Sequence, residues 1–150
     1  MEHLKTVLVY PARRMGNQWE YLILKRLPSR GGVWQGVTGR VEEDEEIFEA
    51  ARRELAEETG LDPLIVKDLH FSFSYLIKDE WRFLYTDDIE KITVFAFAAL
   101  VKTNQDPILD PHEHDQWLWC NIEKALHLID WPDNQAALKL CDREFRSIAK

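Results

Sequence analysis

Cysteine is scarce in this sequence, and repeats, low-complexity tracts and linker-like segments are absent. The two cysteines, Cys120 and Cys141, lie far apart and have no CxxC spacing. We therefore expect both to pack as small, reduced hydrophobic side chains, as in a cytoplasmic protein. With 150 residues and 45% hydrophobic content, the chain is expected to form a single domain over residues 1–150 with a substantial core.

Basic charge and long apolar runs are also lacking. Lys and Arg number 19 against 27 Asp and Glu, which gives a formal net charge of −8. A protein that binds duplex nucleic acid normally carries a basic surface, so this partner is disfavoured. No apolar run reaches the roughly 18 residues of a membrane span, and no basic stretch precedes an apolar segment at the N-terminus. We expect no membrane association, no signal peptide and a cytoplasmic location.

Short apolar, β-branched and aromatic runs predict strands along most of the chain. Residues 92–101 are almost all apolar, which indicates a strand covered on both faces. Residues 78–90 are polar and aromatic without a period, so we expect a loop there. Strands are expected over residues 4–12 (stopped by Pro11), 19–26, 33–38 (ending at Gly39), 65–77, 92–101 and 116–120.

Three segments are expected to be helical. The first begins near Glu43, carries apolar residues every four positions, ends at Gly60 and has the acidic residues 42–46 at its start, where the helix dipole favours them. Asn121 is expected to cap a helix over residues 122–128, and Asp133 is expected to cap a last helix to about residue 147. Together these elements predict an α/β fold with a mixed sheet and helices on both faces.

The first helix ends with three glutamates, Glu54, Glu57 and Glu58, which span about 100° of its surface. Like charges at these spacings repel, and the negative pole of the helix dipole disfavours anions there. They lie beside the apolar stripe, at the edge of the core. The simplest explanation of the three glutamates is a surface helix rich in Glu–Arg pairs, which needs no function. A bound cation would explain them better, and hard oxygen ligands suit Mg²⁺, which also binds substrate phosphates.

The spacing around these glutamates is specific. It reads Gly39, five residues, Glu45, seven residues, Arg53-Glu54-Leu55, one residue, Glu57-Glu58, one residue, Gly60-Leu61. This pattern matches the Nudix box at every specified position, and the chain resembles the Nudix (MutT-like) hydrolases. The resemblance implies an α/β/α sandwich.

The resemblance also implies roles for the residues of the box. The metal would be held by the Gly39 carbonyl and by the carboxylates of Glu54, Glu57 and Glu58. Arg53 would orient the glutamates and would itself be held by Glu45. From its spacing, we expect Arg53 to pair with Glu45 and Glu49 and to leave Glu54, Glu57 and Glu58 free. Mg²⁺ is the expected cofactor, with Mn²⁺ as the alternative. Such ions neutralise phosphates and lower the pKa of a bound water.

A second candidate site is His112-Glu113-His114-Asp115. These residues would form a solvated turn, or His112 and His114 would bind zinc, although no further Cys or His completes a tetrahedral site. Some Nudix enzymes use a glutamate outside the box as general base or additional metal ligand. Glu113 is expected to have this role, and Glu54 is the rival for general base.

Residues outside the box are candidates for substrate binding. Lys25 and Arg26 end a strand, where either would contact phosphate or simply be solvated. Trp34 would stack on a heterocycle or pack in the core. Asn134, with Gln135, would contact that heterocycle or only begin a helix. Short strings, 34–39, 113–114 and 131–136, are similar to the dihydroneopterin triphosphate pyrophosphatases and related nucleoside triphosphate pyrophosphatases.

These features predict a metal-dependent pyrophosphohydrolase that cleaves a nucleoside or pterin triphosphate into a monophosphate and pyrophosphate. A dinucleoside polyphosphate or a nucleotide sugar is the alternative substrate. A non-catalytic nucleotide-sensing module is a second class, and no box glutamate is missing to favour it. Action on RNA 5′ ends is disfavoured by the acidic balance. The expected partner is a small phosphorylated molecule, and a homodimer is left open.

Overall fold

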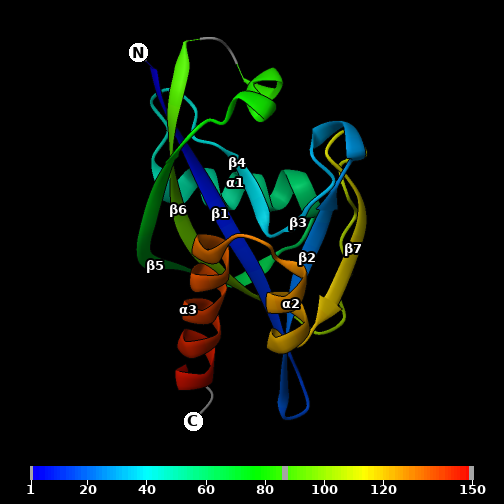
Figure 1. The fold of residues 1–150 in the computed structure, drawn as a ribbon. Helices are drawn as coiled ribbons and strands as arrows, with labels where there is room; N and C mark the ends of the chain where they lie inside the picture. Colours follow the sequence, from blue (N-terminus) through cyan, green and yellow to red (C-terminus); the bar gives the residue numbers. More distant parts are fainter. Residues whose placement is uncertain (1, 86–87, 149–150) are drawn as a thin grey trace.

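The computed structural model describes residues 2–85 and 88–148, and within these ranges seven strands form one mixed sheet (Figure 1). Strands β1 and β6 pair in parallel, whereas the other pairs are antiparallel. The order is β3-β2-β1-β6-β5, with β4 also paired to β1 and β7 to β2. The strands are β1 (Glu2–Met15), β2 (Gln18–Arg26), β3 (Trp34–Gln35), β4 (Val37–Arg40), β5 (Pro63–Leu76), β6 (Ile89–Val101) and β7 (His114–Cys120).

Helices cover both faces of this sheet. Helix α1 (Ile47–Thr59) packs on one face, and α2 (Ile122–Leu128) and α3 (Pro132–Ile148) pack on the other (Figure 1). Alternate residues of β6 enter the two cores, so this strand is covered on both sides as predicted. The predicted α/β/α sandwich with a mixed sheet is confirmed. Across the described residues, none of the helices combines the length and hydrophobicity that crossing a membrane requires.

Strand β1 does not stop at Pro11 but continues to Met15, so the predicted end was wrong. The strand changes its neighbour along its length. Residues Thr6 to Val9 pair with β4, and residues Ala12 to Met15 pair with β2. Pro11 lies between these two stretches. Because Pro11 is paired with neither β4 nor β2, its lack of an N–H removes no hydrogen bond to those strands.

The strand expected over residues 33–38 is divided at Gly36 into β3 and β4. A Cβ atom at Gly36 would lie 2.8 Å from the Tyr10 ring and 2.8 Å from the Val9 carbonyl oxygen. Because only glycine allows so close an approach, the chain lies against β1 here and passes from pairing with β2 to pairing with β1. Strand β4 then runs through Gly39, where the prediction had ended it.

Helix α1 begins at Ile47, four residues later than predicted, and the acidic residues 42–46 form the turn before it. In this turn the Glu42 N–H donates to Glu45 Oε1 at 3.0 Å, which holds the Glu45 side chain in place. The predicted end is confirmed, because Gly60 adopts the left-handed conformation with φ of 68°.

The remaining boundaries are close to the predicted ones. Asn121 caps α2, since its Oδ1 accepts from the Lys124 N–H at 2.9 Å. Asp133 is not the cap of α3, which already begins at Pro132, a residue favoured in the first turn because it lacks an N–H. Within the segment expected as a loop, Asp79–Leu84 form a 3₁₀ turn (η2), β6 begins at Ile89, and residues 86–87 lie outside the described residues. A further 3₁₀ turn, η1 (Pro28–Arg30), follows β2.

Candidate metal and phosphate site

The glutamates of α1 meet the sheet at Gly39 of β4. Glu54 lies directly against the Gly39 backbone, where an added Cβ atom would overlap the carboxyl group. Glu54 and Glu58 are each only 7% exposed, whereas the Glu57 side chain is 57% exposed. Because the three side chains share one side of the helix, α1 presents an array of carboxylate oxygens beside β4.

Arg53 links this array to the turn before α1. Its Nε and Nη2 donate to the two carboxylate oxygens of Glu45 at 2.8 and 3.0 Å. This bidentate bond lowers the pKa of Glu45 to about 2. The predicted pairing with Glu45 is therefore present, whereas the ion pairs of Arg53 within the described residues do not include the predicted one with Glu49. The expectation that Arg53 leaves the metal carboxylates free is wrong, because its Nη1 also donates to Glu54 at 2.8 Å and to Glu57 at 3.1 Å.

The carboxylates carry an electrostatic cost that a cation would relieve. Burial raises the pKa of Glu54 to about 7 even though Arg53 lowers it, and the charges of Glu58 and Glu57 add to the rise. The buried Oε2 of Glu58 has no hydrogen-bond partner among the described residues. A divalent ion would neutralise this charge and supply a partner for that oxygen.

The donor set consists of hard oxygens, which fit Mg²⁺ or Mn²⁺. In the described part of the chain, no three Asp, Glu, His or Cys side chains are grouped closely enough to hold an ion by themselves. An ion at this array would therefore complete its shell with water and substrate phosphates, which is the usual behaviour of Mg²⁺.

His114 is a residue whose place the sequence did not predict. It is 2% exposed, and its Nδ1 lies 3.1 Å from Oε2 of Glu58 without a well-directed hydrogen bond. The expectation of a solvated turn holds for His112, whose side chain is 88% exposed, but it is wrong for His114. Strand β7 begins at His114 and pairs it with Arg26, which turns the imidazole inward beside a candidate metal ligand.

Glu113 lies between two arginines. Its Oε2 is 3.7 Å from Arg26 Nη2 and 3.6 Å from Arg30 Nη1. All three residues line the same cavity as the α1 carboxylates, so Glu113 and Arg26 lie where a candidate site requires them. Arg30 was not predicted. Lys25 is not among the described residues that line this cavity, since successive side chains of a strand point to opposite faces.

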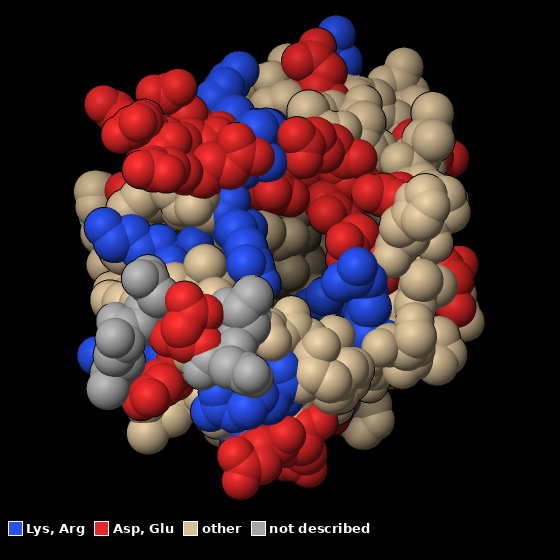
Figure 2. Space-filling view, turned by 90° about the horizontal axis from the view of Figure 1, so that it is seen from above, with Lys and Arg blue, Asp and Glu red and all other residues tan. Residues whose placement is uncertain are grey.

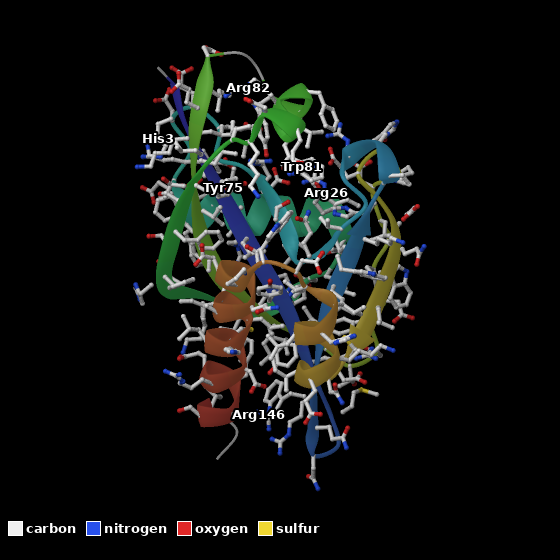
Figure 3. The ribbon with its side chains drawn as sticks, in the orientation of Figure 1. His3, Arg26, Tyr75, Trp81, Arg82 and Arg146 are labelled. Atoms are coloured by element: carbon white, nitrogen blue, oxygen red, sulfur yellow. The ribbon has the colours of Figure 1, made fainter. Side chains whose placement is uncertain are left out.

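This cavity has a volume of about 720 Å³, which is the usual size for a small-molecule site. Figure 2 shows a hollow bounded by acidic side chains and, next to them, by basic ones. Figure 3 shows Tyr75, Trp81 and Arg26 gathered at the same end of the molecule, although they come from β5, η2 and β2. Aromatic residues that line it and that sequence reasoning missed are Phe73, Tyr75, Trp81, Tyr85 and Trp131. Trp81 and Tyr85 belong to the aromatic segment without a period, whereas Phe73 and Tyr75 belong to the strand expected over residues 65–77 and Trp131 to the string 131–136.

The other predicted substrate residues divide between cavity and core. Asn134 is 9% exposed, lines the cavity and accepts from the Tyr10 hydroxyl at its carbonyl oxygen, at 3.0 Å. Gln135 instead joins α3 to α2, because its Nε2 donates to the Ile129 carbonyl at 2.6 Å. Trp34 packs against the core cluster beneath α2 and α3 and is not among the described lining residues. A stacking role for Trp34 stays a prediction.

Comparison with known proteins bears on this site. The NUDIX domain model matches residues 2–141. The chain is 32% identical over 136 residues to an octanoyltransferase of Myxococcus xanthus, covering 91% of this chain but only 36% of that protein. It is 33% identical over 126 residues to an RNA pyrophosphohydrolase of Bartonella henselae, covering 78% of this chain and 72% of the relative.

Two further likenesses are informative. A dihydroneopterin triphosphate diphosphatase of Haemophilus influenzae is 31% identical over 110 residues, covering 71% of this chain and 68% of the relative. Among solved structures, one from Listeria monocytogenes assigned as a NUDIX hydrolase superposes with a TM-score of 0.81 at 26% identity, covering 95% of this chain and 94% of the other.

Proposed function

The chain belongs to the Nudix family, and from this premise we propose that it is a divalent-metal-dependent pyrophosphohydrolase acting on a nucleoside or pterin triphosphate. The family resemblance seen in the sequence is confirmed, as is the expectation of a Nudix-type hydrolase. The observation that carries the proposal is the Glu54 carboxylate seated on Gly39, at the wall of a cavity that also holds arginines and aromatic rings.

Mg²⁺ is the proposed ion, with Mn²⁺ as the alternative, held by Glu54, Glu57, Glu58 and the Gly39 carbonyl. When bound, it supplies charge neutralisation for the phosphates and a lowered pKa for a bound water. Arg53 holds two of these carboxylates in position, and Glu45 holds Arg53. Fixing the donors in this way matters because a small misplacement can cost about 100-fold in rate.

Glu54 and Glu113 are the two candidate bases. The pKa of Glu54 is about 7 in the metal-free protein, and an ion bound to this carboxylate would lower that pKa, so Glu54 would act as a metal ligand or as the base and not as both at once. Glu113 has its carboxylate between two guanidinium groups, so it would first have to leave them. Its role as base or additional metal ligand stays a prediction.

The cavity wall supports a substrate with an aromatic heterocycle. Rings of Tyr75, Trp81, Tyr85 and Trp131 offer faces for stacking, and Asn134 offers an amide for the edge of the ring. The named relatives act on an RNA and on dihydroneopterin triphosphate, which both carry a heterocycle and a phosphate chain. A nucleoside or pterin triphosphate combines these two parts in the smallest molecule.

The proposal is tested with a substrate panel. It compares dihydroneopterin triphosphate, the eight common nucleoside triphosphates, an oxidised dGTP and diadenosine polyphosphates at equal concentration with Mg²⁺, and the products are identified. We expect pyrophosphate and a monophosphate, and loss of turnover in Glu57→Gln. The exposed Glu43→Gln, outside the cavity, is the matched control for charge. Full activity in Glu57→Gln would contradict the assignment of this site as the metal site of a pyrophosphohydrolase.

Triphosphorylated RNA 5′ ends are the second candidate substrate, favoured by the likeness to an RNA pyrophosphohydrolase. The net charge of −8 opposes it, because an RNA chain is repelled by an acidic surface. Adding a 5′-triphosphate oligoribonucleotide to the panel decides between the two. Turnover of the oligonucleotide above that of every mononucleotide would replace our substrate proposal and leave the reaction type unchanged.

A further inference from the structure

Two arginines on the cavity wall, Arg26 and Arg30, make only long contacts with the carboxylate that lies between them. The distances of 3.7 and 3.6 Å from Arg26 and Arg30 to Glu113 exceed the 2.7–2.9 Å of a charge-assisted hydrogen bond. The buried Nε of Arg26 has no hydrogen-bond partner in the described part of the chain. Two guanidinium groups thus share one carboxylate and retain unused donors.

Other hydrogen bonds fix the segments that carry this cluster. The Leu27 N–H donates to the Glu113 carbonyl at 3.1 Å, and Arg30 Nε donates to the His112 carbonyl at 3.0 Å. The pairing of β2 with β7 shifts register between Lys25 and Arg26, and such irregularities commonly re-aim a side chain beside a site. The guanidinium group of Arg30 is therefore held in place before any ligand arrives, and the backbone next to Arg26 is fixed by the Leu27 bond.

We propose that Arg26 and Arg30 form a phosphate subsite, and that Glu113 occupies it as an internal anion until a substrate phosphate displaces it. This inference rests on the proposed function and extends it to the part of the phosphate chain that lies away from the α1 carboxylates and their ion. The planar guanidinium groups can each bind a phosphate through two donors, which one shared carboxylate does not allow.

The exchange has two consequences. A phosphate in the subsite replaces the two long contacts of Glu113 with shorter contacts of its own. The affinity for phosphate therefore depends on how much better the two arginines bind phosphate than the Glu113 carboxylate. The displaced Glu113 carboxylate then becomes free to move within the cavity, which is the condition for its predicted role in the reaction. Ligands without a charged phosphate would leave Glu113 in place, so the subsite selects for phosphate chains.

The subsite can be measured without hydrolysis, by calorimetric titration of the protein in EDTA with inorganic tripolyphosphate. Glu113→Gln removes the competing anion and is expected to tighten binding about tenfold, which corresponds to about nine-tenths occupancy of the subsite by Glu113. Arg30→Gln should weaken binding at least fivefold in both the wild-type and the Glu113→Gln background. Glu43→Gln and the exposed Arg52→Gln are matched controls for the changes in charge.

The outcomes are distinct. Equal affinities in Glu113→Gln and Glu43→Gln would overturn the proposal, and so would an Arg30→Gln protein that binds like Arg52→Gln. Circular dichroism of each variant shows whether it is folded, and Arg30→Lys, which keeps the charge but not the planar donors, should lie between the two. Because Glu57→Gln should abolish hydrolysis and leave this metal-free binding intact, failure of the subsite and failure of the proposed function are separable.

Discussion

At the scale of single residues, the site is set by the balance between burial and charge at Glu54. The carboxyl group is sheltered by Gly39 and by the helix, and it accepts a hydrogen bond from Arg53. Arg53 is itself committed to Glu45, so its charge is shared among several carboxylates. The effect of burial is larger than that of Arg53, so the pKa of Glu54 is raised to about 7 and the metal-free protein binds a proton there up to neutral pH.

This balance predicts that metal binding releases a proton. The folded-state pKa of Glu54 is raised to about 7 from 4.5, so the metal-free fold loses stability as pH rises between these values, and the ion must displace the proton. Titration of Mg²⁺ in weak buffer should release about 0.9 proton per protein at pH 6 and about 0.1 at pH 8. Glu54→Gln should abolish the release at pH 6, and Glu43→Gln should keep it. Release that does not vary with pH would contradict this account.

The residues of the box were predictable from their spacing, whereas some residues that sheet pairing brings to the cavity, His114 and Arg30, were not. The box identified Glu54, Arg53 and their neighbours because all lie within one turn-and-helix segment. His114 and Arg30 reach the site only through the pairing of β7 with β2 and the turn after β2. No local pattern in the sequence records these long-range pairings.

At the scale of elements, two glycines decide how β3 and β4 meet their neighbours. Periodicity located most helices and strands. It did not predict that the segment 33–38 divides into two strands, or that β1 pairs with two different strands along its length, because both features depend on close contact with distant residues. Gly36 lies against the Tyr10 ring and the Val9 backbone, whereas Gly39 lies against the movable end of Glu54. The same substitution should therefore have opposite consequences at the two positions.

Gly36→Ala is expected to destabilise the fold, because a backbone atom must move to admit the methyl group. Such overpacking costs about 1–3 kcal/mol, or roughly 2–12 °C in Tm for a chain of this size. Gly39→Ala should displace only the Glu54 carboxyl group, leaving Tm nearly unchanged while hydrolysis falls about 100-fold. Thermal melts and initial rates of the two variants, measured side by side, test the contrast. A Gly39→Ala protein with normal turnover would show that Glu54 need not rest on β4.

At the scale of the whole molecule, the distribution of charge explains how an acidic protein can bind an acidic substrate. The net charge is −8, but the cavity brings arginines to one part of its wall and carboxylates to another (Figure 2). The composition predicted the need for a cation and not the position of the basic residues, which come from β2, β4, α1, η1 and the residue before η2, Lys78. The folded carboxylates repel one another until an ion is bound, so ion binding and stability are linked.

This linkage predicts a crossover in stability when Glu57 is changed to Gln. Without metal the variant should melt slightly above the wild type, because a repulsion between carboxylates is removed while the side-chain oxygen of the new glutamine can still accept the hydrogen bond from Arg53. Saturating Mg²⁺, at about 100 times its Kd, should stabilise the wild type by about 2.7 kcal/mol, or roughly 5–10 °C in Tm. The variant should gain much less, because a ligand to the ion is lost, so the order of the two melting temperatures reverses as Mg²⁺ is added. Glu43→Gln should follow the wild type throughout, and a Glu57→Gln protein that gains as much from Mg²⁺ as the wild type would place the ion away from α1.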